Sequence, residues 1–290
     1  MTHKAGFVNI IGKPNVGKST LMNMLIGEKL SIITPKAQTT RHRILGIANG
    51  CNYQVVFSDT PGILKPKYKL QERMMNFIEN IFSDADILLF MTDIDDKFEH
   101  IEIIEKINKL ELPIILAINK IDLSNQENVT ELVNKWKTLF PRAEIFAMSA
   151  LHNHNIKELF DRILELLPEN PPFYSKEDLS DRNTRFFVSE VIREKILMQY
   201  SQEIPYSVEV VIDAYEEGKK VDKIQAVIYV ERDSQKGIII GHKGEALKRV
   251  GMNARKDIEK LVGKQVFLEL FVKVKKDWRN NENMLKGFGY

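Results

Sequence analysis

A glycine-rich segment near the N-terminus has the residue types and spacing needed to hold phosphate groups. Gly12-Lys13-Pro14-Asn15-Val16-Gly17-Lys18-Ser19 fits the pattern G-x-x-x-x-G-K-[ST] between an expected strand and an expected helix. Glycines let the backbone wrap around phosphates, so that N–H groups at the helix start face the anionic oxygens. In this arrangement Lys18 supplies a cation and the Ser19 hydroxyl is a Mg²⁺ ligand. The motif predicts binding of a nucleoside triphosphate without indicating its base; a chance loop-to-helix turn is the alternative.

A second segment, Asn119-Lys120-Ile121-Asp122, is suited to reading guanine. Guanine presents a ring N–H and an exocyclic amine on one edge, and the Asp122 carboxylate can accept both hydrogen bonds, whereas adenine would leave a buried Asp122 unpaired. Asn119 can bond the opposite edge, and the Lys120 stem can cover the base. Ser149-Ala150 fits a backbone contact to the guanine carbonyl. Each segment alone could be an ordinary loop; their position after a phosphate loop and at strand ends favours guanine.

Two further segments could sense the metal and the γ-phosphate. Asp59-Thr60-Pro61-Gly62 ends an expected strand, where Asp59 can hold Mg²⁺ through water and the Gly62 N–H can reach the γ-phosphate. Gln38-Thr39-Thr40-Arg41 lies in a polar stretch without periodicity, and we expect Thr40 to join Ser19 and Asp59 on Mg²⁺ when the γ-phosphate is present. Such segments are ordered by a triphosphate and released after hydrolysis. An ordinary loop is the alternative for the two threonines.

The elements that must position these motifs alternate between apolar runs and amphipathic stretches from residue 6 to about 167. This order predicts a mainly parallel sheet covered by helices on both faces, with ligands bound at the C-terminal strand ends. The expected strands are Gly6–Ile11, Tyr53–Ser58, Ile87–Thr92, Ile114–Asn119 and Glu144–Met148, with Ile44–Ala48 added through a hairpin at Asn49-Gly50. The expected helices are Lys18–Leu25, Leu70–Phe82, His100–Leu110, Val129–Phe140 and Ile156–Leu167.

A proline-rich connector, Pro168-Glu169-Asn170-Pro171-Pro172, separates this pattern from a different one. After it the order is α-β-β-α-α-β: Asp181–Tyr200, Tyr206–Ala214, Lys223–Val230, Lys236–Ile240, Glu245–Val262 and Gln265–Val274. We therefore expect a nucleotide-binding domain over residues 1–170, a linker over 171–180 and a second domain over 181–290 with a basic C-terminal tail.

Composition and charge narrow the class of protein. The 290 residues are 43% hydrophobic and 28% charged, as in ordinary globular proteins. Net charge is only +2, yet residues 236–286 carry 13 Lys and Arg against 6 Asp and Glu, as a polyanion-binding surface would require; a solvated charged face is the alternative. Cys51 is the only cysteine, so no intrachain disulfide can form. Without a signal peptide or a run long enough to span a bilayer, we expect a soluble, cytoplasmic protein.

Within this basic region, Gly241-His242-Lys243-Gly244 is a GxxG turn between two expected helices. KH domains use such a loop to clamp about four nucleotides, because the glycines allow close approach to the sugar–phosphate chain. A plain helix connector is the alternative; the element order and charge favour RNA binding. Further candidates, which could instead be solvated or packed side chains, are Lys248, Arg249, Arg255, Lys256, Lys273, Lys275, Lys276, Trp278 and Arg279, with Trp278 suited to stacking on a base.

Together these motifs resemble a known family. The N-terminal part is similar to the translation-factor-related GTPases, and nearly all 290 residues resemble the Era-like family of bacterial GTPases through GKPNVGKST, KAQTTRHR, DTPG, NKID, SAL, SEVIREK and GHKGEALKRVG. The resemblance implies an α/β P-loop GTPase domain with a mainly parallel sheet, followed by an α+β type II KH domain. It assigns the nucleotide site to Gly12 to Ser19, Gln38 to His42, Asp59 to Ile63, Asn119 to Asp122 and Ser149 to Leu151.

The resemblance also implies a biological role. Era-like proteins are GTP-hydrolysing switches that bind small-subunit ribosomal RNA near its 3′ end and assist maturation of the small ribosomal subunit. From the resemblance we expect a monomer, weak peripheral association with the inner face of the cell membrane, and coupling of subunit assembly to cell-cycle or growth control.

One residue departs from the Ras-like pattern. Ile63 follows Gly62, where Ras-like enzymes carry a water-orienting glutamine, and isoleucine cannot position water by hydrogen bonding. Era-like GTPases share this substitution, and members of the wider class with asparagine at the position of Asn15 are thought to recruit K⁺ in place of an arginine finger. The resemblance thus implies slow, K⁺-stimulated hydrolysis, with GTP or GDP, Mg²⁺ and K⁺ as cofactors and Lys18, Thr40, Gly62 and Asn15 as catalytic residues. A loop-stabilising amide is the alternative for Asn15.

Two other functions fit parts of the sequence. An ATP-dependent small-molecule kinase would also use a phosphate loop, although Asp122 opposes adenine. An RNA chaperone could hold a nucleotide for structural reasons only, and it would release no phosphate over multiple turnovers.

Overall fold

The computed structural model describes residues 2–96 and 101–290, so that His100, where one helix was expected to begin, lies outside the described residues. The chain forms two compact units. The first contains Met1–Ser31, Thr40–Lys65 and Met75–Asp181; the second contains Ile32–Thr39, Pro66–Met74 and Arg182–Tyr290. Among the described residues, no helix combines the length and the apolar character needed to cross a membrane.

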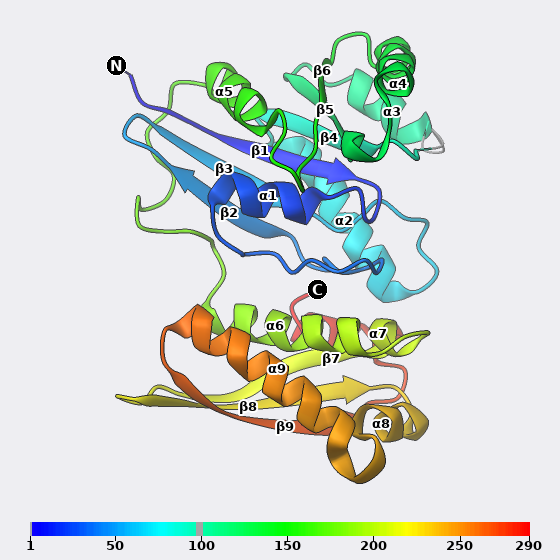
Figure 1. Ribbon diagram of the computed structural model, residues 1–290, viewed down its shortest axis with the longest axis vertical. Helices are drawn as coiled ribbons and strands as arrows, with labels where there is room; N and C mark the ends of the chain where they lie inside the picture. Colours follow the sequence, from blue (N-terminus) through cyan, green and yellow to red (C-terminus); the bar gives the residue numbers. More distant parts are fainter. Residues whose placement is uncertain (1, 97–100) are drawn as a thin grey trace. The chain divides into compact units, whose positions relative to one another are not determined.

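The first unit is built on a six-stranded sheet with the order β2-β3-β1-β4-β5-β6 (Figure 1). Its strands are β1 (Lys4–Gly12), β2 (Ile44–Asn49), β3 (Tyr53–Asp59), β4 (Ile87–Asp93), β5 (Ile114–Asn119) and β6 (Glu144–Ala147). All neighbouring strands are parallel except β2 and β3, which form the expected antiparallel hairpin. The mainly parallel sheet is thereby confirmed, and its strand ends place the motifs together.

Helices cover both faces of this sheet: α1 (Lys18–Ile26), α2 (Lys69–Asp84), α3 (Ile101–Asn108), α4 (Gln126–Leu139) and α5 (Ile156–Leu166). Side chains of α2, α3 and α4 share one buried cluster with Leu88 and Phe90 of β4. On the other face, the ring of Phe160 in α5 lies 6.3 Å from that of Phe57 in β3. Strands buried on both faces explain why their sequences scarcely alternate.

The segment expected as a linker lies along the edge strand β2. The Leu179 carbonyl accepts from the Ile47 N–H at 2.9 Å, and the Ser180 hydroxyl donates to the Leu45 carbonyl at 2.5 Å. Gln54 also donates to the Tyr174 carbonyl at 2.9 Å. These bonds satisfy an otherwise open sheet edge, and the first unit accordingly extends to Asp181.

The second unit has the expected α-β-β-α-α-β order, with α6 (Thr184–Gln199), β7 (Glu209–Glu216), β8 (Val221–Val230), α8 (Asp233–Ile240), α9 (Glu245–Val262) and β9 (Gln265–Val274). Strand β8 pairs antiparallel with β7 and parallel with β9. Short elements that the sequence pattern did not predict are α7 (Ile204–Ser207), η3 (Trp278–Asn280) and α10 (Glu282–Gly287). Helices α6, α8 and α9 cover one face of this sheet (Figure 1).

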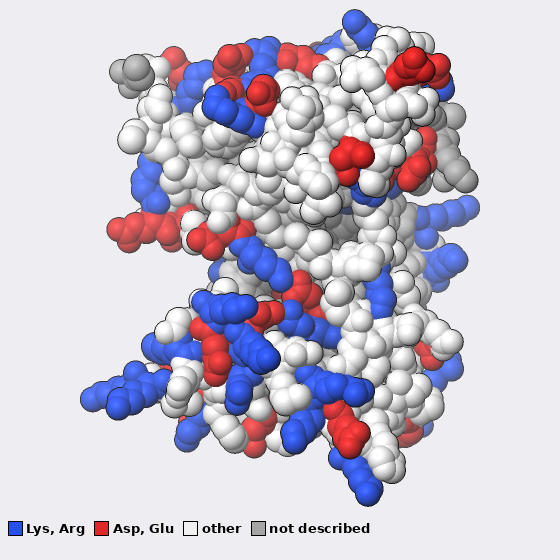
Figure 2. Space-filling view, viewed as in Figure 1, with Lys and Arg blue, Asp and Glu red and all other residues white. Residues whose placement is uncertain are grey.

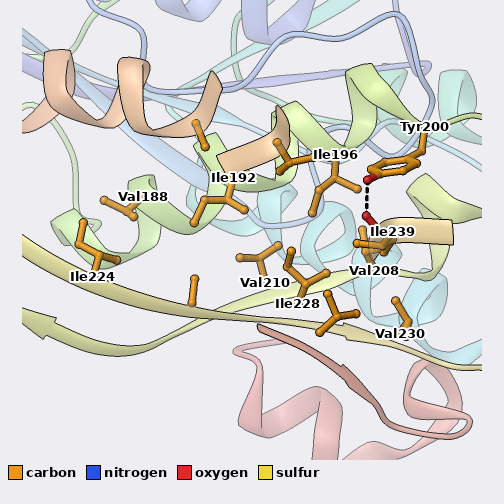
Figure 3. Packing of buried hydrophobic residues seen from close by; sticks show 14 of the residues in the cluster. Val188, Ile192, Ile196, Tyr200, Val208, Val210, Ile224, Ile228, Val230 and Ile239 are labelled. Carbon is orange, nitrogen blue, oxygen red and sulfur yellow. Dashed lines mark hydrogen bonds between the residues drawn. The ribbon is translucent and has the colours of Figure 1, made fainter. Parts of the chain in front are cut away.

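Alternate residues of β8 and one stripe of α6 build the core of the second unit (Figure 3). Val188, Ile192 and Ile196 follow one another at four-residue spacing on α6 and are fully buried. Below them, Ile224 and Ile228 point inward from β8 because successive strand residues face opposite sides. The Tyr200 hydroxyl donates to the Ile239 carbonyl at 2.6 Å, which secures the end of α8 just before the GxxG loop.

Residues 32–39 and 66–74 belong to the second unit although they come from the first half of the chain. The Arg193 guanidinium donates to the carbonyls of Gln38 and Thr39. The Tyr68 hydroxyl donates to Gln38 Oε1 at 2.9 Å, and the Tyr68 ring lies 4.7 Å below the Arg279 guanidinium. Polar contacts of this kind explain why the stretch around Gln38 and Thr39 shows no hydrophobic period.

Candidate nucleotide and RNA sites

The phosphate loop connects β1 to α1 and has the backbone geometry that the motif requires. Gly17 has φ 103°, and a Cβ there would lie 2.3 Å from Asn119 Nδ2, so only glycine fits. Lys18 Nζ donates to the carbonyls of Gly12 at 3.1 Å and Lys13 at 2.8 Å. Burial lowers the pKa of Lys18 to about 8, an effect that the nearby Asp59 charge opposes. A phosphate anion here would therefore compensate a buried cation.

The three side chains expected to hold Mg²⁺ lie together. Ser19 Oγ donates to Asp59 Oδ2 at 2.6 Å and lies 2.9 Å from Thr40 Oγ1, which is 3.3 Å from the same carboxylate. Burial raises the pKa of Asp59, and the charge of Lys18 opposes this effect. Its Oδ1 is buried with no hydrogen-bond partner among the described residues. Hard oxygen donors around an unsatisfied carboxylate oxygen fit a Mg²⁺ ion.

The DTPG segment brings Gly62 against the phosphate loop. A Cβ at Gly62 would lie 2.5 Å from the Pro14 nitrogen, which only glycine avoids. The next residue, Ile63, donates its backbone N–H to the Gly12 carbonyl at 3.0 Å, and its side chain is buried in the core. The Ile63 side chain therefore does not reach toward an attacking water.

Asn119 joins three motifs at the C-terminal ends of the strands. Its Nδ2 donates to the Val16 carbonyl at 2.8 Å, and its Oδ1 accepts from the Ala150 N–H at 2.9 Å. Asn119 thus ties the phosphate loop, the NKID segment and the SAL segment together, a role that sequence reasoning missed. One amide N–H and one lone pair are left for a base.

Two carboxylates that sequence reasoning missed also line this region. Lys120 Nζ lies 2.6 Å from Asp93 Oδ2, and Lys13 Nζ lies 2.7 Å from Asp96 Oδ1. Asp93 ends β4, so its position at the end of an expected strand could have identified it as a site residue. The first pair holds the Lys120 stem in place, as covering a base would require.

Asp122 lies in η1 (Ile121–Leu123), directly after β5. Its side chain is 22% exposed, so a base can reach it. Leu151, at the end of the SAL segment, is 77% exposed. The structure thus brings the three guanine motifs to one place while leaving Asp122 accessible.

The GxxG loop has the expected unusual backbone. Gly241 has φ 72° and Gly244 has φ 80°, and Lys243 between them also lies in the left-handed region at φ 50°. A Cβ at Gly241 would lie 2.5 Å from the Ala246 Cβ. The side chains of His242 and Lys243 are exposed, so the loop can present them to a phosphate chain.

A groove of about 400 Å³ runs from this loop between α9 and β9. Two of the predicted basic residues, Lys248 and Arg255, line it, while its remaining lining is mostly apolar: Gly244, Leu247, Gly251, Met252, Phe267, Leu268 and Leu270. Lys and Arg side chains are prominent on the unit that contains α9, with acidic ones between them (Figure 2). Sequence reasoning missed the apolar lining, because exposed Met252 and Phe267 are separated in the chain and only the fold brings both to the groove. A groove with an apolar floor and basic rim suits stacked bases and their phosphates.

The expectation that Trp278 stacks on a base is wrong. Its side chain is 0% exposed, its Nε1 donates to the Ser207 carbonyl at 3.0 Å, and its ring packs against Phe288. Arg279 beside it pairs with Glu231. The other predicted basic residues, Arg249, Lys256, Lys273, Lys275 and Lys276, are exposed.

These features define a GTPase joined to a KH domain: a phosphate loop on a mainly parallel sheet, a carboxylate placed to read guanine, and a GxxG loop in an α-β-β-α-α-β domain. Family models match accordingly: a "50S ribosome-binding GTPase" model over residues 7–120 and a "KH domain" model over residues 203–279. GTPase Era of Staphylococcus haemolyticus is 44% identical over 291 aligned residues, which cover 99% of this chain and 97% of that protein. The chain belongs to the Era family and is a GTPase.

Solved structures agree across the full length. Era in complex with MgGDPNP and nucleotides 1506–1542 of 16S ribosomal RNA is 41% identical, with a TM-score of 0.95 and 99% of each chain covered. A point variant of Aquifex aeolicus Era bound to GDP and aluminium fluoride has the same identity, TM-score and coverage. GTP or GDP and Mg²⁺ are the cofactors that these relatives support.

Proposed function

We propose that this GTPase binds small-subunit ribosomal RNA near its 3′ end and assists maturation of the small ribosomal subunit, under the control of its bound nucleotide. The observation that carries the proposal is the GxxG loop opening onto the groove between α9 and β9, rimmed by Lys248 and Arg255. Its support from a relative is the 41% identical Era that was solved with this part of 16S ribosomal RNA. Coupling to growth control is a further part of the proposal.

The reaction transfers the γ-phosphoryl group of GTP to water. Lys18 and the backbone N–H groups of the loop stabilise the charge that builds on the transferring group, and the Gly62 N–H adds a donor. Ser19, Asp59 and Thr40 would hold Mg²⁺, which supplies charge neutralisation when bound. Asp122 and Asn119 select guanine, with Lys120 and the SAL backbone contributing to the base site.

Potassium is the proposed substitute for an arginine finger. Asn15 is exposed on the phosphate loop at φ 64°, and the buried Ile63 side chain cannot orient water. We expect GTP hydrolysis to be at least about ten-fold faster in KCl than in NaCl at equal ionic strength, and Asn15→Ala to abolish the difference. Phosphate release measured in the two salts checks this; equal rates would remove K⁺ from the proposal.

RNA recognition is tested with an RNA that spans nucleotides 1506–1542 of 16S ribosomal RNA, the stretch present in the related complex. Filter binding with Mg²⁺ and GDPNP should give at least about ten-fold tighter binding than a scrambled RNA of equal length. Replacing GDPNP with GDP should weaken binding to the specific RNA. Equal affinity for both RNAs would refute the sequence-specific part, and equal affinity in both nucleotide states would refute the switch.

The remaining proposals concern organisation and location. We propose that residues 1–170 act as the GTPase domain and 181–290 as the KH domain, in a cytoplasmic monomer with weak peripheral membrane association. The family relationship supports these assignments. Sedimentation of the purified protein, alone and with vesicles containing anionic lipids, tests the oligomeric state and the membrane association.

A further inference from the structure

The guanine-reading carboxylate has a titratable neighbour that none of the nucleotide motifs includes. His152 Nε2 lies 3.6 Å from Asp122 Oδ2. The two residues come from different loops, one after β6 and the other after β5. The His152 side chain is 62% exposed and that of Asp122 is 22% exposed, so the imidazole lies on the more open side of the pair.

The loop that carries His152 is a defined turn. Ser149 and His154 exchange backbone hydrogen bonds of 3.2 and 3.0 Å, and the His152 N–H donates to Ser149 Oγ at 3.3 Å. Asn153 and Asn155 adopt left-handed φ values of 54° and 58°. These contacts hold His152 beside Asp122.

A base and the imidazole can share this carboxylate. An ionised carboxylate has about four lone-pair positions, two on each oxygen. The ring N–H and the exocyclic amine of guanine need one position on each oxygen, and His152 Nε2, at ion-pair distance from Oδ2, does not compete for these positions. The geometry therefore allows cooperation between the imidazole and guanine.

We propose that His152 is a positioning residue for guanine recognition. In its protonated form it forms an ion pair with Asp122 across 3.6 Å and orients the carboxylate toward the base. This inference rests on the assignment of Asp122 to guanine and names a specificity element within that site.

The proposal predicts how guanine-nucleotide affinity changes with pH. A base that covers Asp122 removes water from the carboxylate, and its attraction to a protonated imidazole then grows because the local dielectric falls. Binding therefore favours the protonated imidazole, so this pair contributes more to guanine-nucleotide affinity at lower pH. Other charged groups described near this part of the site include Lys120, which is paired with Asp93, and Lys13, which is paired with Asp96.

The test compares GDP dissociation constants of the wild-type protein, His152→Ala and the neighbouring control His154→Ala at pH 5.8 and pH 7.5. Titration of the GDP phosphates affects all three proteins alike, so the ratio of the variant's dissociation constant to that of wild type reports the contribution of the substituted histidine. We expect His152→Ala to bind about two- to five-fold more weakly at pH 5.8 and within about 1.5-fold at pH 7.5, with His154→Ala unchanged at both. His152→Gln, which is polar but cannot carry the charge, should weaken binding relative to wild type at pH 5.8 as His152→Ala does.

A second comparison asks whether the effect passes through Asp122. In an Asp122→Asn background, probed with xanthosine diphosphate, whose C2 carbonyl can accept from an amide, adding His152→Ala should change affinity by less than about 1.5-fold at either pH. A pH-independent His152→Ala effect, an equal effect of His154→Ala, or tighter binding by His152→Ala at pH 5.8 would overturn the proposal. Failure of the wild-type protein to prefer guanine would instead refute the role of Asp122.

Discussion

At the scale of single residues, the phosphate site combines two buried charges that only a ligand can fully compensate. Burial lowers the pKa of Lys18 and raises that of Asp59, so each group is pushed toward its neutral form. Phosphate oxygens beside the lysine and a divalent cation beside the carboxylate reverse both effects. The free protein thus has two ionisable groups with perturbed pKa values at the place where its nucleotide binds, as is common at functional sites.

This arrangement predicts proton uptake when GTP binds at alkaline pH. The pKa of Lys18 is about 8 in the free protein, and adjacent phosphates raise it, so free protein that has lost the proton must regain it on binding. We expect Lys18 to contribute an uptake of about 0.1 proton at pH 7.0 and about 0.8 at pH 8.7, with affinity falling as pH rises above about 8. Calorimetry in two buffers of different ionisation enthalpy measures the uptake. Equal uptake at the two pH values would contradict the lowered pKa.

At the scale of elements, the loop between α8 and α9 uses different residues for RNA binding and for folding. His242 and Lys243 are exposed, while Gly241 and Gly244 adopt the backbone conformations that close the turn. Charge on the two central side chains can therefore be changed with little effect on the fold.

We expect the double substitution His242→Asp, Lys243→Asp to weaken binding of single-stranded RNA by at least about ten-fold, because two carboxylates would face the phosphate chain. GTP hydrolysis without RNA should stay within about two-fold of wild type. The matched control is Lys219→Asp, Lys220→Asp on the exposed β7–β8 turn, where the charge change is slightly larger. Equal losses of RNA binding in both variants would point to general electrostatics instead of the loop.

The turn after β9 is a packing element, and Trp278 is its anchor. We expect Trp278→Phe to reduce the free energy of unfolding by about 1–2 kcal/mol, because it loses the hydrogen bond to Ser207 and some packing, and Trp278→Ala to cost about 3–5 kcal/mol. RNA affinity of the Phe variant should remain within about two-fold of wild type. Urea unfolding and filter binding check both parts. A loss of RNA affinity at unchanged stability would restore the stacking interpretation.

At the scale of the whole molecule, the second unit includes residues 32–39, the stretch that directly precedes Thr40. Arg193 is 1% exposed, pairs with Glu190 at 2.6 Å and donates to the carbonyls of Gln38 and Thr39. A buried guanidinium thus satisfies both a carboxylate and backbone groups that lack a regular partner.

Arg193→Met should destabilise the second unit by about 3–5 kcal/mol, because the buried Glu190 would lose the guanidinium that pairs with it at 2.6 Å. The double variant Glu190→Leu, Arg193→Met should recover most of this loss, since both charges are gone. In both variants the amides of residues 32–39 should exchange hydrogen faster than in wild type. Hydrogen exchange with fragment analysis measures the exchange rates of residues 32–39 and of the rest of the second unit. Unchanged exchange in residues 32–39 would show that Arg193 does not hold this stretch.

The sequence by itself determined the features that depend on local spacing. The phosphate loop, the NKID segment and the GxxG turn were predicted because their chemistry lies in consecutive residues, and the alternation of strands and helices predicted a parallel sheet. Boundaries were less accurate: α8 begins at Asp233 instead of Lys236, and β7 at Glu209 instead of Tyr206, since the ends of elements depend on caps and packing.

Only the tertiary structure decided which distant residues meet. Hydrophobic period shows that a residue faces inward or outward but not what it faces, so Trp278 could not be assigned to the core, nor Phe267 to the groove. The pairing of His152 with Asp122 and the membership of residues 32–39 in the second unit likewise depend on polar contacts between remote segments. Such contacts leave no period in the sequence, because each requires only one side chain at the right place.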